Sequence, residues 1–141
     1  MYSNQRIEVV CFGKPTGKYA SLVVPDEYLA ATPELLREIC NGCGSAGAKF
    51  DFVPDTIYGL NINPACDPHD WEYHYGVSEE DKKRGDGLFY TNMLRLIEAQ
   101  GGLLEWPRKR RALKYYMAVK HLGHEAFYSE DDLIELEDTA P

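Results

Sequence analysis

Apolar residues recur at helical spacing in the middle of the chain. After Ser78 they fall three or four residues apart behind a single carboxylate, Asp86, and they are Phe89, Tyr90, Met93, Leu94 and Ile97. Ser78 can cap a helix, and the three acidic residues that follow it favour a first turn. The pattern predicts a long helix with one apolar side, at the head of which Asp86 needs a partner if it is buried.

Two other stretches carry the signals of a helix start and a helix end. Residues 32–41 begin with Thr-Pro-Glu and stop before a glycine, and residues 107–121 begin with a proline and stop before Gly123. Proline suits the first turn of a helix, and glycine suits the residue after the last turn. We therefore expect a short helix in the first stretch and a third long helix in the second.

The N-terminal part is rich in β-branched residues and shows no helical stripe. Short runs at Ile7–Cys11 and Ser21–Val24 are separated by Gly13–Lys18. This is typical of a β-hairpin with a longer loop, either a scaffold flap over the helices or a flap that guards a substrate. The expected fold class is mainly α: two antiparallel core helices, a packed C-terminal helix and a small N-terminal β-hairpin.

Length and composition fit one domain. The chain has 141 residues, of which 44% are hydrophobic and 27% charged, and this length can enclose one core. We expect a hairpin extension at 1–31, a helical core at 32–123 and an acidic tail at 124–141. The net charge of −8 argues against a nucleic-acid partner, and the absence of any run of about 18 apolar residues argues against a transmembrane segment.

Candidate catalytic and metal-binding side chains are most concentrated in Cys66–Tyr73, which reads Cys-Asp-Pro-His-Asp-Trp-Glu-Tyr. Either Asn63-Pro64 or Asp67-Pro68 can open its helix. We favour a start near Asp67, because Pro68 deeper inside would remove a backbone hydrogen bond. On this helix His69 and Tyr73 stand one turn apart on one face, while Asp70 projects about 100° round. The imidazole and the carboxylate can thus face different partners, as a general base beside a metal-binding carboxylate requires.

This stretch resembles the catalytic helix of the secreted phospholipase A2 superfamily. Three more motifs, in the same order, are similar to its bacterial and fungal branch: Pro-Asp-x-x-aromatic-Gly at Pro54–Gly59, Asp-x-x-Phe-Tyr-x-x-Met at Asp86–Met93, and Tyr-Tyr-x-Ala-Val-Lys at Tyr115–Lys120. The likeness covers residues 41–123. It implies a phospholipase A2-like domain that hydrolyses the sn-2 ester of glycerophospholipids at a phospholipid membrane surface or micelle.

The resemblance also implies a task for each catalytic residue. His69 would accept a proton from the water that attacks the ester, and Asp86 would hold the other ring nitrogen. Tyr73 and Tyr116 would hydrogen-bond Asp86. A disulfide would join Cys43 to Cys66.

The cofactor implied by the resemblance is calcium, a cation that binds hard oxygen ligands. Asp70 would supply its carboxylate, and Gly42, Gly44 and Ala46 would supply backbone carbonyls from a loop rich in small residues. Glycine permits such a loop to turn its carbonyls inward.

Two alternatives stay open. Cys40, Cys43, Cys66 and His69 have the pair spacing of a Cys₃His zinc site, which would make the protein a structural zinc-binding module. A catalytically inactive phospholipase A2-like protein is the other. The zinc pattern does not explain Asp86 or the third helix, whereas the phospholipase pattern accounts for both.

A basic run, Arg108–Arg111, follows the apolar residues Leu103, Leu104 and Trp106. Such a run is commonly a solvated face, but beside apolar residues it can meet anionic lipid head groups. The polar N-terminus is unlike a signal peptide. We therefore expect synthesis in the cytoplasm, with release by lysis, by a phage particle or by a dedicated secretion route.

Overall fold

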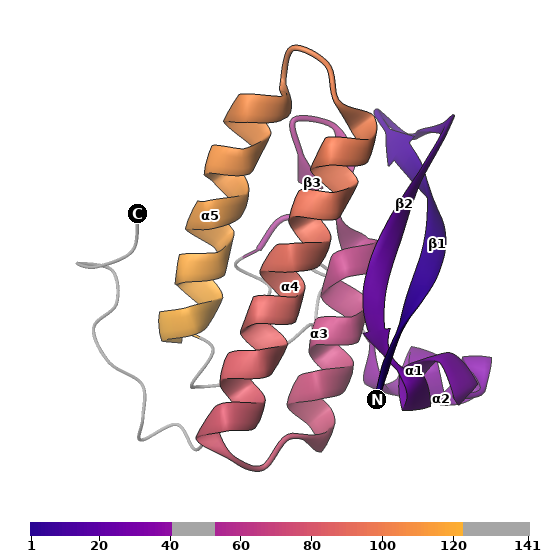
Figure 1. Cartoon of the computed structure of the whole chain (residues 1–141), viewed down its shortest axis with the longest axis vertical. Helices are drawn as coiled ribbons and strands as arrows, with labels where there is room; N and C mark the ends of the chain where they lie inside the picture. Colours follow the sequence, from indigo (N-terminus) through magenta and orange to yellow (C-terminus); the bar gives the residue numbers. More distant parts are fainter. Residues whose placement is uncertain (41–52, 123–141) are drawn as a thin grey trace.

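A computed structural model describes residues 1–40 and 53–122 of the chain. In chain order the elements are β1 (Tyr2–Cys11), β2 (Lys14–Pro25), α1 (Asp26–Ala30), α2 (Pro33–Ile39), β3 (Thr56–Ile57), β4 (Leu60–Asn61), α3 (Asn63–Tyr75), α4 (Glu79–Gln100) and α5 (Glu105–Leu122). The three long helices stand side by side, and the β1–β2 hairpin runs along the outside of this bundle (Figure 1). The short helices α1 and α2 lie at the end where the chain begins.

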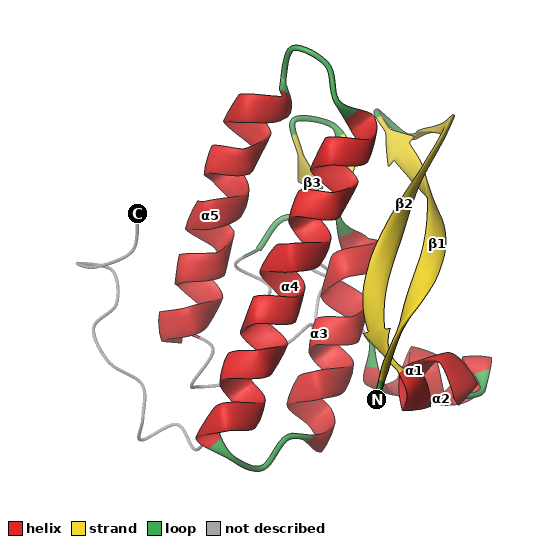
Figure 2. Cartoon of the chain, viewed as in Figure 1, coloured by secondary structure: helices red, strands yellow, loops and turns green. Residues whose placement is uncertain are grey.

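The expectation of a mainly α protein with a small hairpin is wrong. Helices make up 59% and strands 24% of the described residues, and the strands form one antiparallel sheet in the order β2-β1-β4-β3. The hairpin strands contain 10 and 12 residues and reach along most of the bundle (Figure 2). The protein is therefore a mixed fold, with a sheet beside a three-helix layer.

The hairpin is longer than expected because Gly13, Pro15 and Gly17, which predict a loop, are accommodated within it. Its turn consists only of Phe12 and Gly13, with φ of 51° and 77°, the positive values that suit a two-residue hairpin turn. Pro15 lies in β2, an edge strand, where a missing N–H costs no sheet hydrogen bond. Gly17 has a φ of 74° opposite the register shift between Glu8 and Val10, and such a bulge absorbs extra residues.

Helix α4 covers the free edge of β2. The fully buried Asn92 accepts a hydrogen bond from the Val23 N–H and donates one to the Val23 carbonyl, both at 2.8 Å. Arg95 donates to the Ser21 carbonyl at 2.9 Å. Outward backbone groups of an edge strand need partners, and α4 supplies them. Asn92 and Arg95 are not members of the apolar stripe predicted from the sequence, so this contact was not expected.

The helix boundaries follow local signals with one exception. Thr32 caps α2 by accepting from the Leu35 N–H, and Ser78 and Asp81 form a capping box at the start of α4, as the sequence predicts. Helix α3 begins at Asn63 and not near Asp67, so that Pro68 lies inside it. None of the described helices combines the length and apolarity needed to cross a bilayer.

Candidate active site

Two buried side chains from neighbouring helices meet at the centre of the bundle. His69 Nε2 on α3 lies 2.9 Å from Asp86 Oδ1 on α4. Their exposed fractions are 1% and 2%. This confirms the predicted contact between the imidazole and the carboxylate, while the catalytic tasks assigned to the two residues stay predictions.

Tyr73 holds the same carboxylate oxygen. It stands one turn after His69 on α3, and its hydroxyl donates to Asp86 Oδ1 at 2.5 Å. The hydrogen bond that the sequence predicts between these two residues is therefore present. Asp86 Oδ1 accepts from two sides, which fixes the plane of the carboxylate relative to the ring.

The second carboxylate oxygen is bound by Lys82, which the sequence analysis did not single out. Lys82 Nζ lies 2.8 Å from Asp86 Oδ2, and it also donates to the carbonyls of Val119 at 3.4 Å and Lys120 at 3.0 Å. These carbonyls belong to the last turn of α5, at the negative end of the helix dipole. The ammonium, 4% exposed, thus joins Asp86 to the end of a third helix.

Lys82 explains why the predicted bond from Tyr116 to Asp86 is wrong. Within the described residues, the carboxylate oxygens of Asp86 bond only to His69, Tyr73 and Lys82. Tyr116 instead stacks on Tyr90, with ring centroids 4.9 Å apart. The spacing of Lys82 and Asp86, four residues apart on one helix, was the available signal, since such pairs share a face.

Aromatic rings fix the orientation of the imidazole. The Phe89 ring stacks on His69 with a centroid separation of 4.7 Å and an interplanar angle of 17°, and the Tyr73 ring lies 4.5 Å away at 57°. Phe89 is part of the apolar stripe predicted from the sequence. The motif residues behind Asp86 therefore hold the ring that Asp86 contacts.

Asp70 lies next to this pair on α3 and is fully buried. Its neighbour Tyr28 packs edge-on against Trp71, with ring centroids 5.9 Å apart. Burial, and after it the negative charges of Asp67, Cys40 and Asp70, raises the pKa of the Tyr28 phenol. The other predicted calcium ligands, Gly42, Gly44 and Ala46, lie outside the described residues.

The cysteines divide into two kinds. Cys66 is part of a disulfide, whereas Cys11 and Cys40 are thiols that form no disulfide. Cys43, the partner that the resemblance implies for Cys66, lies outside the described residues. Within residues 1–40 and 53–122, no group of three or more His, Cys, Asp or Glu side chains is arranged to hold a metal ion.

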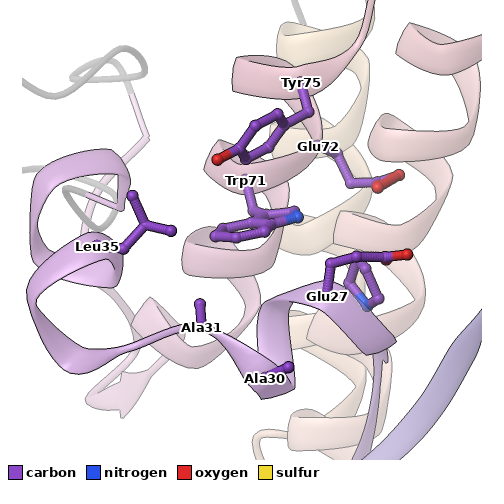
Figure 3. A pocket seen from close by; sticks show the side chains of 8 residues that line it. Glu27, Ala30, Ala31, Leu35, Trp71, Glu72 and Tyr75 are labelled. Carbon is purple, nitrogen blue, oxygen red and sulfur yellow. The ribbon is translucent and has the colours of Figure 1, made fainter.

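An apolar pocket of about 520 Å³ opens on another side of α3. Trp71 and Tyr75 form one wall and Ala31 and Leu35 of the N-terminal segment the other, while the carboxylates of Glu27 and Glu72 lie on the same side of it (Figure 3). Trp71 follows His69 by two residues and so projects about 200° away round the helix. The pocket is therefore separate from the contact between His69 and Asp86.

The basic run does not form a uniform solvated face. Arg108 is 2% exposed and donates to the carbonyls of Ile57 and Tyr58 at 3.1 and 2.5 Å. Lys109 forms ion pairs with Glu98 and Glu105 at 3.0 and 3.2 Å, and the remaining two arginines of the run are exposed. The fold thus uses one arginine as an internal tether and neutralises the lysine.

No protein-family model, curated protein or solved structure matches this chain. The interpretation of the site depends on its geometry and on the motifs that carry it.

Proposed function

We propose that this protein hydrolyses the sn-2 ester of glycerophospholipids, with His69 as the general base that activates a water molecule. The observation that carries the proposal is the buried contact of 2.9 Å between His69 Nε2 and Asp86 Oδ1. A carboxylate behind an imidazole orients the ring and stabilises the cation formed when the ring takes a proton. The choice of a lipid ester derives from the ordered motifs that resemble the phospholipase A2 superfamily.

The orientation of the ring assigns the two nitrogens different tasks. Because Nε2 faces Asp86, Nδ1 is the nitrogen that accepts the proton of the attacking water. The water oxygen bonds to the ester carbonyl carbon, and Nδ1 then returns the proton to the leaving glycerol oxygen. The products are a fatty acid and a lysophospholipid, and no serine or cysteine nucleophile takes part.

Calcium is the cofactor of this proposal, and a fully buried carboxylate beside the base is a suitable ligand for it. Asp70 would hold the ion together with the carbonyls of Gly42, Gly44 and Ala46. A bound calcium ion supplies positive charge for the lipid phosphate and for the oxyanion that develops on the ester. Phe89 and Tyr73 meanwhile keep the His69 ring in place.

The zinc alternative receives less support from the geometry. Cys66 is in a disulfide, and a disulfide sulfur is not the thiolate that a structural zinc site needs. The nitrogen Nε2 of His69 faces Asp86 rather than a sulfur ligand. The inactive alternative has the same expected fold and differs only in its failure to release fatty acid.

Release of fatty acid from phospholipid vesicles tests the proposal. The lipids carry different acyl chains at sn-1 and sn-2, and the products are identified by mass spectrometry with calcium or with a chelator. We expect sn-2 fatty acid and its lysophospholipid with calcium only. The inactive alternative predicts no release in either condition, and a metal analysis that finds bound zinc supports the Cys₃His module.

A matched pair of variants assigns the activity to the site. His69→Asn should lower the rate by at least about 100-fold, because a positioned general base contributes that much or more. His74→Asn changes an exposed histidine of the same helix and should retain the activity. Equal rates for His69→Asn and the wild type, with both folded by circular dichroism, contradict the assignment.

A further inference from the structure

Three connections between elements gather at one end of the molecule. The β1–β2 turn, the β3–β4 turn and the α4–α5 connection all lie at the end opposite to α1 and α2 (Figure 1). The Phe12 N–H donates to the Gly59 carbonyl at 2.7 Å, and Arg108 ties the second turn to α5 through the carbonyls of Ile57 and Tyr58. These bonds make the three connections one surface.

Large apolar side chains point out of this surface. Leu103 is 99% exposed, Phe12 70% and Trp106 66%. One exposed apolar residue needs no explanation, but several together on adjoining turns indicate a surface that meets an apolar partner.

Cations stand beside these side chains. Arg110 lies over the Trp106 ring at 5.1 Å and Arg111 over the Tyr58 ring at 5.5 Å. With Lys114 these residues line a pocket of about 190 Å³, and none of the residues lining it is acidic. We call the group the turn-tip surface; its members are Tyr58, Leu103, Trp106, Arg110, Arg111 and Lys114.

The charge of the surface differs from that of the chain. The protein carries a net charge of −8, and neighbouring Lys109 is neutralised by Glu98 and Glu105. Arg110, Arg111 and Lys114 remain without an ion pair to any described residue. An uncompensated cationic cluster on an acidic protein selects an anionic partner.

We propose that the turn-tip surface binds an anionic lipid bilayer. Arg110, Arg111 and Lys114 contact the head-group phosphates, while Leu103 and Trp106 enter the boundary between head groups and acyl chains. Aromatic residues and arginines are well suited to this boundary, and an aliphatic side chain as exposed as Leu103 gains by leaving water there. A nucleic acid offers phosphates but no apolar layer for Leu103.

Vesicle flotation tests the charged part of the surface. Binding is measured in chelator, with vesicles of phosphatidylcholine alone or mixed with phosphatidylglycerol. We expect tighter binding to the mixed vesicles, and Arg110→Ala/Arg111→Ala should weaken it roughly 30-fold, since each cation near an anionic membrane contributes about 1 kcal/mol. Raised salt should also weaken the binding of the wild type to the mixed vesicles, because salt screens the attraction between the arginines and the lipid phosphates.

A matched control removes the same charge at the other end of the molecule. Arg37→Ala/Lys83→Ala changes two exposed residues, on α2 and near the start of α4. It should bind the mixed vesicles as the wild type does. Equal weakening by the two double variants, or no preference for the mixed vesicles, overturns the proposal.

The apolar part has its own readout. Trp106 fluorescence should shift to the blue when mixed vesicles are added, and Trp106→Phe should abolish the shift because the other tryptophan, Trp71, is buried. Leu103→Ser should weaken binding that persists at high salt. A protein that forms a dimer in solution and leaves Trp106 unchanged by vesicles covers this surface with a second copy, which also overturns the proposal.

The inference does not depend on hydrolysis, because binding is measured in chelator. If His69→Asn floats with the mixed vesicles but the wild type releases no fatty acid, the proposed enzymatic function fails and the docking surface stands. If the wild type cleaves short-chain phospholipid in solution but floats with no vesicle, the docking surface fails and the proposed enzymatic function stands.

Discussion

Lys82 Nζ donates to Asp86 Oδ2 at 2.8 Å, so that an ammonium and the carboxylate of the proposed catalytic pair form an ion pair in the protein interior. Lys82 is satisfied on all sides by Asp86 and by the last carbonyls of α5. The position of Asp86 relative to His69 therefore depends on α5 as well as on α3 and α4. The ammonium also compensates the charge of a carboxylate that lies away from water.

Lys82→Met should destabilise the protein by about 3–5 kcal/mol, because removing one partner leaves the other buried charge uncompensated. Urea unfolding followed by circular dichroism measures this. Lys82→Met/Asp86→Asn removes both charges and should recover part of the loss. Lys83→Met, at an exposed position of α4, is the control, and a loss as large as that of Lys82→Met would contradict the interpretation.

Tyr73 and Tyr116 were both predicted to hydrogen-bond Asp86, and their substitution by Phe should have different effects. Tyr73→Phe removes a hydrogen bond to the Asp86 carboxylate and should lower the free energy of unfolding by about 1.5–3 kcal/mol. It should also reduce hydrolysis. Tyr116→Phe retains the ring that stacks on Tyr90 and should change neither quantity. Equal effects of the two variants would show that the Tyr73 hydroxyl has no special importance.

Asn92 should be essential for the attachment of the hairpin. Asn92→Leu leaves both the N–H and the carbonyl of Val23 without their partner, and we expect a loss of about 2–4 kcal/mol in the free energy of unfolding. Hydrogen exchange should increase in β2. Thr91→Leu changes an exposed neighbour on the same helix and is the control. Unchanged exchange at Val23 in Asn92→Leu is the result that speaks against this attachment.

Asp81 makes part of the folding stability depend on pH. Hydrogen bonds from the Val77 N–H, then from Arg84, lower the pKa of Asp81 from 3.8 to about 2. A carboxylate whose pKa is lower in the folded state stabilises the protein above its unfolded pKa and loses this effect as the pH falls through the folded value. The difference in melting temperature between wild type and Asp81→Asn should thus be constant above pH 3.8 and shrink toward pH 2.

The control for Asp81 removes a charge from the same helical turn. Glu80→Gln lies in the first turn of α4 but outside the capping box. Its melting temperature should follow the wild type through the acid range. A constant difference for Asp81→Asn down to pH 2 contradicts the assigned hydrogen bonds.

Thiol titration separates the proposed function from the zinc module. The chain has four cysteines, of which Cys66 is in a disulfide, while Cys11 and Cys40 form none. Unfolded protein prepared without reductant should release two reactive thiols, because one disulfide uses two of the four. Four thiols, together with bound zinc, would favour the Cys₃His site.

The sequence by itself determines what depends on neighbours along the chain. Thr32 and Ser78 predict the starts of α2 and α4, because a cap is an interaction between residues close in sequence. His69, Tyr73 and Asp86 could be paired in advance because helical spacing and the ordered motifs place them on facing sides of two helices.

Only the tertiary structure decides what depends on distant segments. The attachment of the hairpin to the helices depends on α4, where Asn92 satisfies an edge strand 69 residues earlier in the chain. Lys82 rather than Tyr116 completes the Asp86 site because the end of α5 offers carbonyls to a buried ammonium. Buried polar groups must find partners wherever the fold provides them, and that choice is made in three dimensions.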